Sequence, residues 1–245
     1  MPPPLSPPSP QDDALSAYFF SGETLRSRGV ATRLLSGVVE VPAPPARLAA
    51  DWARETTSSL APGDVDTLPL ARARMRWPDY RRCVQAVADW MRERGLPDLT
   101  GSSDVALMAC RGARYHHDAL QYGSAAFCNL FLSEDRDLDV HFPGTGQRIP
   151  LVRGTVLLFD TAQPHAVIRR GAAGFDAADF APARDLTQVF LTWELPIAHP
   201  DVARALGIVF DTDPATAARL DEEQVHSRGA PAEVCPASGR WRPVG

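Results

Sequence analysis

The feature that most constrains the fold is a series of short apolar segments between residues 103 and 195. Each segment is five to ten residues long, and Gly, Pro, Asp or Ser separates it from the next. This length and spacing are typical of an all-β sandwich or barrel. The segments are 105–110, 125–132, 138–142, 148–152, 154–160, 165–170 and 186–195. We therefore expect a mainly β protein with flanking helices.

The flanking regions carry helical periodicity instead. An apolar stripe at helical spacing runs through 78–95 and consists of Val84, Val87, Trp90 and Met91. Gly95 stands where a glycine commonly follows the last helical residue. Further helices are expected over 45–60, 200–209 and 213–227, with a short one within 11–20. A strand is expected over 38–45, a connection over 61–78, and irregular chain over 229–245.

The length of 245 residues suits one large β domain with helical additions, and no internal repeat is present. Within that domain we expect four regions. They are a disordered proline-rich tail (1–12), an N-terminal support region of helices and strand (13–100), the catalytic core (101–197), and C-terminal helices with an irregular tail (198–245).

Composition excludes several classes of protein. The formal net charge of −5 provides no basic surface for nucleic acid or for an anionic membrane. No apolar run approaches the ~20 residues of a membrane span. All 25 basic residues are arginine, so chemistry that depends on lysine, such as a Schiff base, is excluded. The composition does not indicate an oligomeric state.

The cysteines and the N-terminal segment indicate the compartment. The four cysteines have neither the spacing of a zinc site nor that of a disulfide framework, so we expect inert thiols in a reducing cytosol. The first residues lack both the basic and the apolar part of a signal peptide. The expected location is therefore cytoplasmic.

The most informative motif is His116-His117-Asp118, followed by His165. Residues i and i+2 of a strand share a face, so His116 and Asp118 can hold one metal while His117 points away. His165 follows 47 residues after Asp118 (165 minus 118) and must come from a distant strand. Two imidazoles and one carboxylate suit non-haem Fe(II) and leave coordination positions open.

The order of these motifs resembles that of the Fe(II)- and 2-oxoglutarate-dependent dioxygenases. The resemblance covers about 105–195 and rests on H-x-D, an apolar strand ending in NLFLSED, the segment LDVHF, and PLVRGTVLLFDT leading to HAV. That family has a double-stranded β-helix, or jelly roll, with a cupin-like core. The first 100 residues resemble no family.

The resemblance implies a set of roles and a reaction. His116, Asp118 and His165 would be the iron ligands and the catalytic centre. The cosubstrates would be 2-oxoglutarate and O₂, and decarboxylation to succinate and CO₂ would accompany hydroxylation of an unactivated C–H bond. The intact carboxylate of H-x-D favours hydroxylation over halogenation, while desaturation and cyclisation stay open.

A 2-oxoglutarate site needs a partner for the distal carboxylate, and a bidentate arginine suits it. Arg184 is the first candidate because it precedes a hydrophobic strand, with Thr187 as an additional hydroxyl donor. The 19 residues between His165 and Arg184 exceed the usual interval of the family. Arg169 is the rival candidate, because it shares a strand face with His165. Asn129 is polar on an apolar strand and needs partners if it is buried; a cosubstrate oxygen is one candidate, and a backbone carbonyl is an equal alternative.

Other polar residues near the motif have open roles. His141 would make a three-histidine, cupin-type ligand set if it joined the site, although a wall or surface role is preferred. Tyr115 and Tyr122 are candidates to supply hydroxyl groups. Arg111 and Arg114 are candidates for contact with the substrate or the cosubstrate, although arginines in such positions are more often surface residues.

The leading hypothesis is an oxygenase that hydroxylates a small molecule, such as an amino acid or a biosynthetic intermediate. Hydroxylation of a peptide or protein side chain is the main alternative. A cupin-like protein that holds a metal or ligand without redox turnover is the alternative from another class. Nucleic-acid demethylation is disfavoured by the acidic charge balance.

Overall fold

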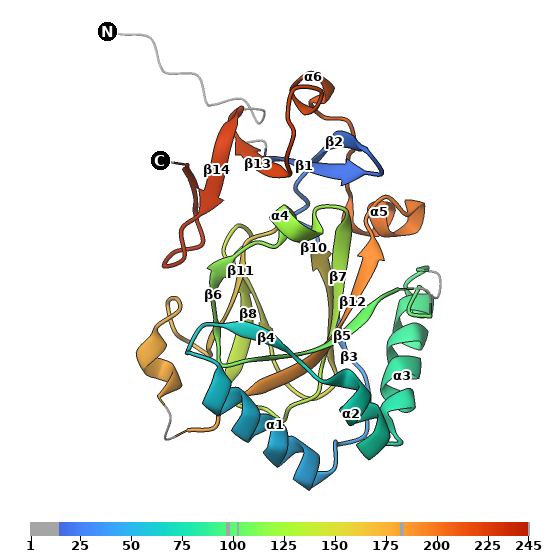
Figure 1. Cartoon of the computed structure of the whole chain (residues 1–245), viewed down its shortest axis with the longest axis vertical. Helices are drawn as coiled ribbons and strands as arrows, with labels where there is room; N and C mark the ends of the chain where they lie inside the picture. The colour runs from blue at the N-terminus through green and yellow to red at the C-terminus, as the bar shows by residue number, and fades with distance from the viewer. Residues whose placement is uncertain (1–14, 97–98, 102, 182–183, 245) are drawn as a thin grey trace, which may run out of the picture.

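The computed structural model describes residues 15–96, 99–101, 103–181 and 184–244, so the proline-rich segment 1–12 lies outside the described residues. The architecture is mainly antiparallel β, with two sheets that face each other as in a jelly roll and a third sheet above them (Figure 1). The expected fold class is therefore confirmed.

The larger of the two facing sheets has six strands in the order β3-β10-β7-β12-β5-β4. Their bounds are β3 Leu35–Val38, β4 Val65–Leu68, β5 Val105–Cys110, β7 Ala125–Phe131, β10 Thr155–Asp160 and β12 Gln188–Pro196. The smaller sheet has the order β6-β11-β8-β9. Its strands are β6 Ala113–His116, β8 Leu138–Phe142, β9 Gln147–Pro150 and β11 His165–Arg169.

Alternation along the central strands separates two cores. On β12, Leu191, Trp193 and Leu195 face outward into one apolar cluster, while Phe190, Thr192 and Glu194 face the cavity between the sheets. Strand β7 alternates in the same way. Because successive side chains of a strand point to opposite faces, one sequence supplies both the scaffold core and the cavity wall.

Helices cover the outer face of the six-stranded sheet. They are α1 Ala46–Ser59, α2 Leu70–Arg76 and α3 Tyr80–Glu93. Val87, Trp90 and Met91 of α3 are buried in the cluster that also contains Leu191 and Trp193. Gly95 follows α3 with a φ of 71°, the left-handed conformation expected for a residue just past a helix.

The third sheet lies above the two facing sheets, next to helix α4 (Figure 1). Its order is β15-β14-β13-β1-β2. The strands are β1 Leu15–Ser21, β2 Thr24–Gly29, β13 Gln224–Ser227, β14 Ala230–Val234 and β15 Trp241–Pro243. The remaining helices are α4 Ala119–Tyr122, α5 Pro200–Leu206, α6 Pro214–Ala217 and the 3₁₀ turn η1 Ala177–Phe180.

The seven expected core strands are present, and each boundary lies within two residues of its prediction. The helices expected over 45–60 and 78–95 are also present as α1 and α3. Helix α5 ends before 209, because Gly207 adopts a left-handed conformation with a φ of 74°. In the described part of the chain, no helix is long and apolar enough to cross a bilayer.

Several predictions for the flanking regions are wrong. The described part of 11–20 is a strand, because it pairs with both β2 and β13. The segment 61–78 contains β4, which pairs with β5, and α2. The helix expected over 213–227 is present only as α6, which ends at Ala217, and residues 224–227 form strand β13 instead.

Two further predictions at the ends of the fold also fail. The strand expected over 38–45 occurs earlier, as β3, where it pairs with β10. The segment 229–245 was expected to be irregular, yet it contains β14 and β15, which pair with each other. Strand β3 forms because it pairs with the distant strand β10, and β14 and β15 form because they pair with each other. Local periodicity does not encode either kind of pairing.

Candidate metal centre

Three side chains converge at one end of the cavity between the two facing sheets. The ligand atoms of His116, Asp118 and His165 all lie within 4.8 Å of one another. His116 Nε2 is 3.7 Å from Asp118 Oδ1, and His165 Nε2 is 3.6 Å from Asp118 Oδ2. These distances exceed those of a hydrogen bond. The side chains therefore approach a common point without bonding to one another.

Backbone carbonyls orient both imidazole rings. His116 Nδ1 lies 2.7 Å from the Arg114 carbonyl oxygen, and His165 Nδ1 lies 3.0 Å from that of Gln163. A proton on Nδ1 donates in each of these contacts, which leaves the lone pair on Nε2. The second hydrogen bond of a metal-binding histidine typically fixes its tautomer in this way. Both Nε2 atoms are thus available as ligands.

The strand argument for H-x-D is only partly correct. Strand β6 ends at His116, which pairs with His165 of β11. Asp118 has a φ of −108° and a ψ of 4°, and it precedes helix α4. Its N–H donates to the Thr161 carbonyl oxygen at 2.8 Å. The carboxylate is therefore positioned by the β10–β11 turn and not by strand alternation.

A buried network, not anticipated from the sequence, holds this turn in place. Thr161 Oγ1 donates at 2.7 Å to the Tyr122 carbonyl oxygen, at the end of α4. Arg28 Nη1 is 2.7 Å from Asp160 Oδ2, and both side chains are 0% exposed. Arg28 also donates to the Gly123 carbonyl oxygen. The network joins β2, α4 and the turn that leads to His165.

Burial shapes the charges of the metal centre. It raises the pKa of the Asp118 carboxyl, and the neighbouring histidines oppose that effect. Burial also lowers the pKa of His165 well below its ordinary value, with His116 acting in the same direction. His165 is accordingly neutral at pH 7, which is the form that binds metals. A divalent cation would compensate the buried carboxylate.

The cavity that contains the cluster has a volume of about 270 Å³. Its wall is mainly apolar, with Phe127, Phe131, Phe159 and Phe190 contributing aromatic rings. Drug-sized ligands commonly occupy pockets of ~300 to 1,000 Å³. The space beside these three candidate metal ligands therefore suits a small ligand, or the end of a larger one.

One of the four residues proposed from the sequence for the cosubstrate lines this cavity. Asn129 does so; it is 8% exposed, and its Oδ1 has no partner among the described residues. Thr187 lies instead in a groove that also contains Trp52 and Arg136. Arg184 is exposed and absent from the cavity wall.

Arg169 has the expected strand position but a different partner. It lies two residues beyond Val167, which lines the cavity, so it belongs to the same face of β11. Its guanidinium, however, donates to Asp137 Oδ2 at 2.9 Å. The arginine that would bind a cosubstrate carboxylate thus stays a prediction.

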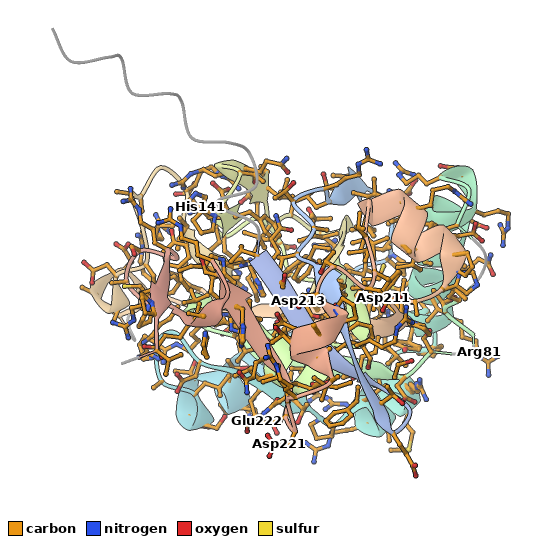
Figure 2. The ribbon with its side chains drawn as sticks, turned by 90° about the horizontal axis from the view of Figure 1, so that it is seen from above. Arg81, His141, Asp211, Asp213, Asp221 and Glu222 are labelled. Carbon is orange, nitrogen blue, oxygen red and sulfur yellow. The ribbon has the colours of Figure 1, made fainter. Side chains whose placement is uncertain are left out.

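The remaining candidates divide between the cavity and other contacts. Tyr122 lines the cavity. Tyr115 contacts His141 instead, with its hydroxyl 2.6 Å from Nδ1. His141 is outside the ligand cluster, and it lies toward the rim of the molecule when seen from above (Figure 2). His117 packs against Trp241 with ring centroids 4.9 Å apart, away from the cluster.

The two upstream arginines make structural contacts. Arg111 is buried and donates at 2.6 Å to the Phe180 carbonyl oxygen. Arg114 is exposed and pairs with Asp64 at 2.8 Å. Neither arginine lines the cavity.

Glu194 is the cavity residue that the sequence motifs did not reveal. It lines the same wall as Thr192 and Phe190, because all three share one face of β12. The alternation of the segment FLTWEL would have placed Glu194 in the cavity if the sequence had shown which face of the strand points inward. No motif distinguishes the glutamate from an ordinary residue at a strand end.

Comparisons with known proteins give structural similarities only. No protein-family model matches the chain, and no curated protein sequence matches it. A Pseudomonas putida prolyl-4-hydroxylase is similar, with 17% identity over 66% of this chain and 92% of that chain, and a TM-score of 0.40.

Two other solved structures are similar at a comparable level. A viral collagen prolyl hydroxylase from Paramecium bursaria chlorella virus-1, in its 2-oxoglutarate complex, has 8% identity over 66% of this chain and 94% of that chain, with a TM-score of 0.38. A non-heme alpha-ketoglutarate-dependent epimerase from nogalamycin biosynthesis has 14% identity over 69% and 83%, with a TM-score of 0.34. Similarity at this level does not define a family, so the site itself has to support any function.

Proposed function

We propose that this chain is an Fe(II)- and 2-oxoglutarate-dependent oxygenase that hydroxylates an unactivated C–H bond of a small molecule. The single observation that carries the proposal is the convergence of His116, Asp118 and His165 at one end of an apolar cavity. Two neutral imidazoles and a carboxylate are the donor set of non-haem Fe(II) sites, which keep positions open for other ligands.

The donor chemistry of the site fits ferrous iron. Both imidazoles present Nε2 because their Nδ1 atoms meet backbone carbonyl oxygens. Asp118 adds the carboxylate, and its backbone N–H donates to the Thr161 carbonyl oxygen. When bound, iron with 2-oxoglutarate and O₂ supplies the oxidising power, and the protein supplies position and water exclusion. Phe159, whose ring centroid is 4.8 Å from that of His165, provides apolar surroundings beside the cluster.

The polar groups of the cavity wall suit a small 2-oxo acid, although they are neutral and not basic. Asn129 of β7 and Thr192 of β12 are cross-strand neighbours that both line the wall, and each offers a hydrogen-bonding group. Neither Arg169 nor Arg184 contributes to that wall. We assign the first polar contact of the cosubstrate tail to Asn129, whose buried side-chain amide lines the cavity and can donate from Nδ2 to a carboxylate oxygen.

The cavity size supports a small-molecule substrate. About 270 Å³ must accommodate the cosubstrate and the reacting carbon together, which leaves little space for a bulky substrate. The hydroxylation of a peptide side chain would require the remainder of the peptide to lie outside this cavity. A non-redox cupin-like role would need neither the open metal positions nor the dry aromatic wall.

Coupled turnover tests the proposal. Purified protein with Fe(II) and 2-oxoglutarate should consume O₂ and release succinate and CO₂ in equal amounts, slowly without substrate and faster with a suitable one. Asp118→Ala should abolish this reaction, while Asp64→Ala, which alters a surface ion pair, should not. Absence of 2-oxoglutarate-dependent succinate formation in the iron-loaded wild type would exclude the proposed activity.

A further inference from the structure

We propose that the mouth of the cavity binds a cationic group of the substrate, a protonated amine, through the carboxylate of Glu194 and the rings of Tyr122 and Phe127. This inference rests on the proposed function for the identity of the bound molecule as substrate. It concerns a binding site separate from the three metal-binding side chains.

The charges of the cavity wall are the first observation. Among the residues that the structure describes, Asp118 and Glu194 are the charged side chains besides the histidines that line it, and no arginine does so. Asp118 belongs to the set of candidate metal ligands. Within the described wall, Glu194 therefore supplies a negative charge that a bound metal would not neutralise, with no arginine beside it to receive an anionic substrate.

The isolation of Glu194 is the second observation. Its carboxylate has no hydrogen bond or ion pair within the described part of the chain, although many of the acidic groups on this arginine-rich surface are paired. Partial burial raises the pKa of Glu194, and nearby Asp104 acts in the same direction. Partial burial and the charge of Asp104 both disfavour the ionised form of Glu194, and a cation bound beside the carboxylate would offset that energetic cost.

Aromatic rings beside the carboxylate are the third observation. Phe127 is the cross-strand neighbour of Glu194 in the β12–β7 pair, and both line the cavity. Tyr122 and Phe127 pack edge to face, with centroids 5.0 Å apart. A carboxylate next to aromatic faces is suited to an ammonium group, because the faces attract cations. These rings also reject the hydrated anions that a basic pocket would take.

The geometry links this mouth to the metal cluster. The Phe127 ring lies 6.1 Å from that of Phe159, which lies 4.8 Å from the His165 ring. An amine held at Glu194 would thus extend along these aromatic rings toward the three metal-binding side chains. An α-amino acid is less suitable, because no basic residue of the wall would receive its carboxylate.

Binding of three matched probes tests the inference. They are 2-phenylethylammonium, 2-phenylethanol and 3-phenylpropionate, measured by calorimetry on the full chain without added metal, so that no probe can bind iron. The wild type should bind the ammonium at least about tenfold more tightly than the alcohol or the carboxylate. Glu194→Gln should remove that preference and leave the affinity for the alcohol within about twofold.

A neighbouring acid supplies the matched control. Asp104 lies outside the cavity wall but close to Glu194, so Asp104→Asn should change the ammonium affinity by less than about threefold. An equal loss in both variants would show only general electrostatic attraction and would overturn the inference. The same conclusion would follow if the wild type bound the alcohol or the carboxylate as tightly as the ammonium.

The outcome is distinguishable from failure of the proposed function. Ammonium binding by the metal-free protein requires no turnover and no iron. If the ammonium preference is present but succinate is never formed, the amine site stands and the oxygenase assignment fails. If succinate forms but Glu194→Gln binds the ammonium as the wild type does, the oxygenase assignment stands and the amine site fails.

Discussion

At the scale of single residues, the candidate site depends on which atoms of a side chain are left free. His116 and His165 each use one ring nitrogen for a backbone carbonyl, so the other nitrogen faces the centre of the cluster. His141 also uses Nδ1, in its case for the Tyr115 hydroxyl, but it lies outside the cluster. Asn129 leaves its Oδ1 free inside the cavity. Position in the fold, and not the choice of ring nitrogen, therefore separates the candidate metal ligands from His141.

The polar wall gives a prediction for cosubstrate binding. Asn129→Ala should weaken the affinity for 2-oxoglutarate at least about tenfold, since a hydrogen bond to a charged carboxylate contributes about 1.5 kcal/mol or more. Arg184→Ala should leave it within about twofold, because Arg184 does not line the cavity. Anaerobic calorimetry with the Fe(II)-loaded proteins measures both affinities. A loss of more than tenfold in Arg184→Ala would instead support the arginine favoured by the sequence.

Single residues were predictable to different degrees. The types and spacing of His116, Asp118 and His165 identified the cluster, because metal binding needs those chemical groups. The sequence did not reveal that the strand ends before Asp118 or that Thr161 orients it. Both facts depend on a turn more than 40 residues away, to which the local sequence gives no signal.

At the scale of elements, α4 and the β10–β11 turn have to keep a fixed relation for the cluster to form. The Arg28–Asp160 ion pair joins β2 to that turn, and Asp160 also accepts N–H bonds from Ala31 and Ala162. The pair is fully buried, so neither charge can turn to water if the other is lost. Buried pairs of this kind are costly to break on one side.

Asp160→Ala should therefore lower the free energy of unfolding by about 3 to 5 kcal/mol. The control is Asp51→Ala, which breaks an exposed ion pair with Arg76 and should cost at most about 1 kcal/mol. Urea denaturation followed by tryptophan fluorescence measures both. Equal, small losses in the two variants would show that the buried network does not stabilise the turn.

Elements whose structure follows from their own alternation or periodicity were the predictable ones. The seven core strands and helices α1 and α3 each carry a clear apolar pattern. The missed strands β1, β2, β4, β13, β14 and β15 lie at a sheet edge or in the third sheet. Their conformation is decided by hydrogen bonds to distant strands, as in the pairing of β1 with β13.

At the scale of the whole molecule, the two facing sheets form the walls of the cavity. Helices cover the outer face of the six-stranded sheet, and the third sheet lies above α4 (Figure 1). Cys83, Cys110 and Cys128 are buried in the cores of this arrangement, and burial raises the pKa of each to about 12. The pKa of Cys235 is lowered, chiefly by a hydrogen bond with Ser238.

Thiol reactivity should report on the integrity of these layers. At pH 8 the native protein should show one rapidly reacting thiol, Cys235, because the thiolate is the reactive form. The other three should react only as fast as the molecule unfolds, and all four should react in denaturant. Ellman's reagent counts them, and Cys235→Ser should remove the rapid phase. Rapid reaction of two or more thiols in the native protein would mean that the cores open independently.

The most direct test of the metal centre is an anaerobic titration with Fe(II) followed by 2-oxoglutarate. The wild type should bind one Fe(II) per chain and develop a weak visible charge-transfer band when 2-oxoglutarate is added. His165→Ala should lose both, and His141→Ala should retain both, since His141 lies outside the cluster. A wild type without the band, or a His165→Ala protein that keeps it, would contradict the assignment of these three side chains to ferrous iron.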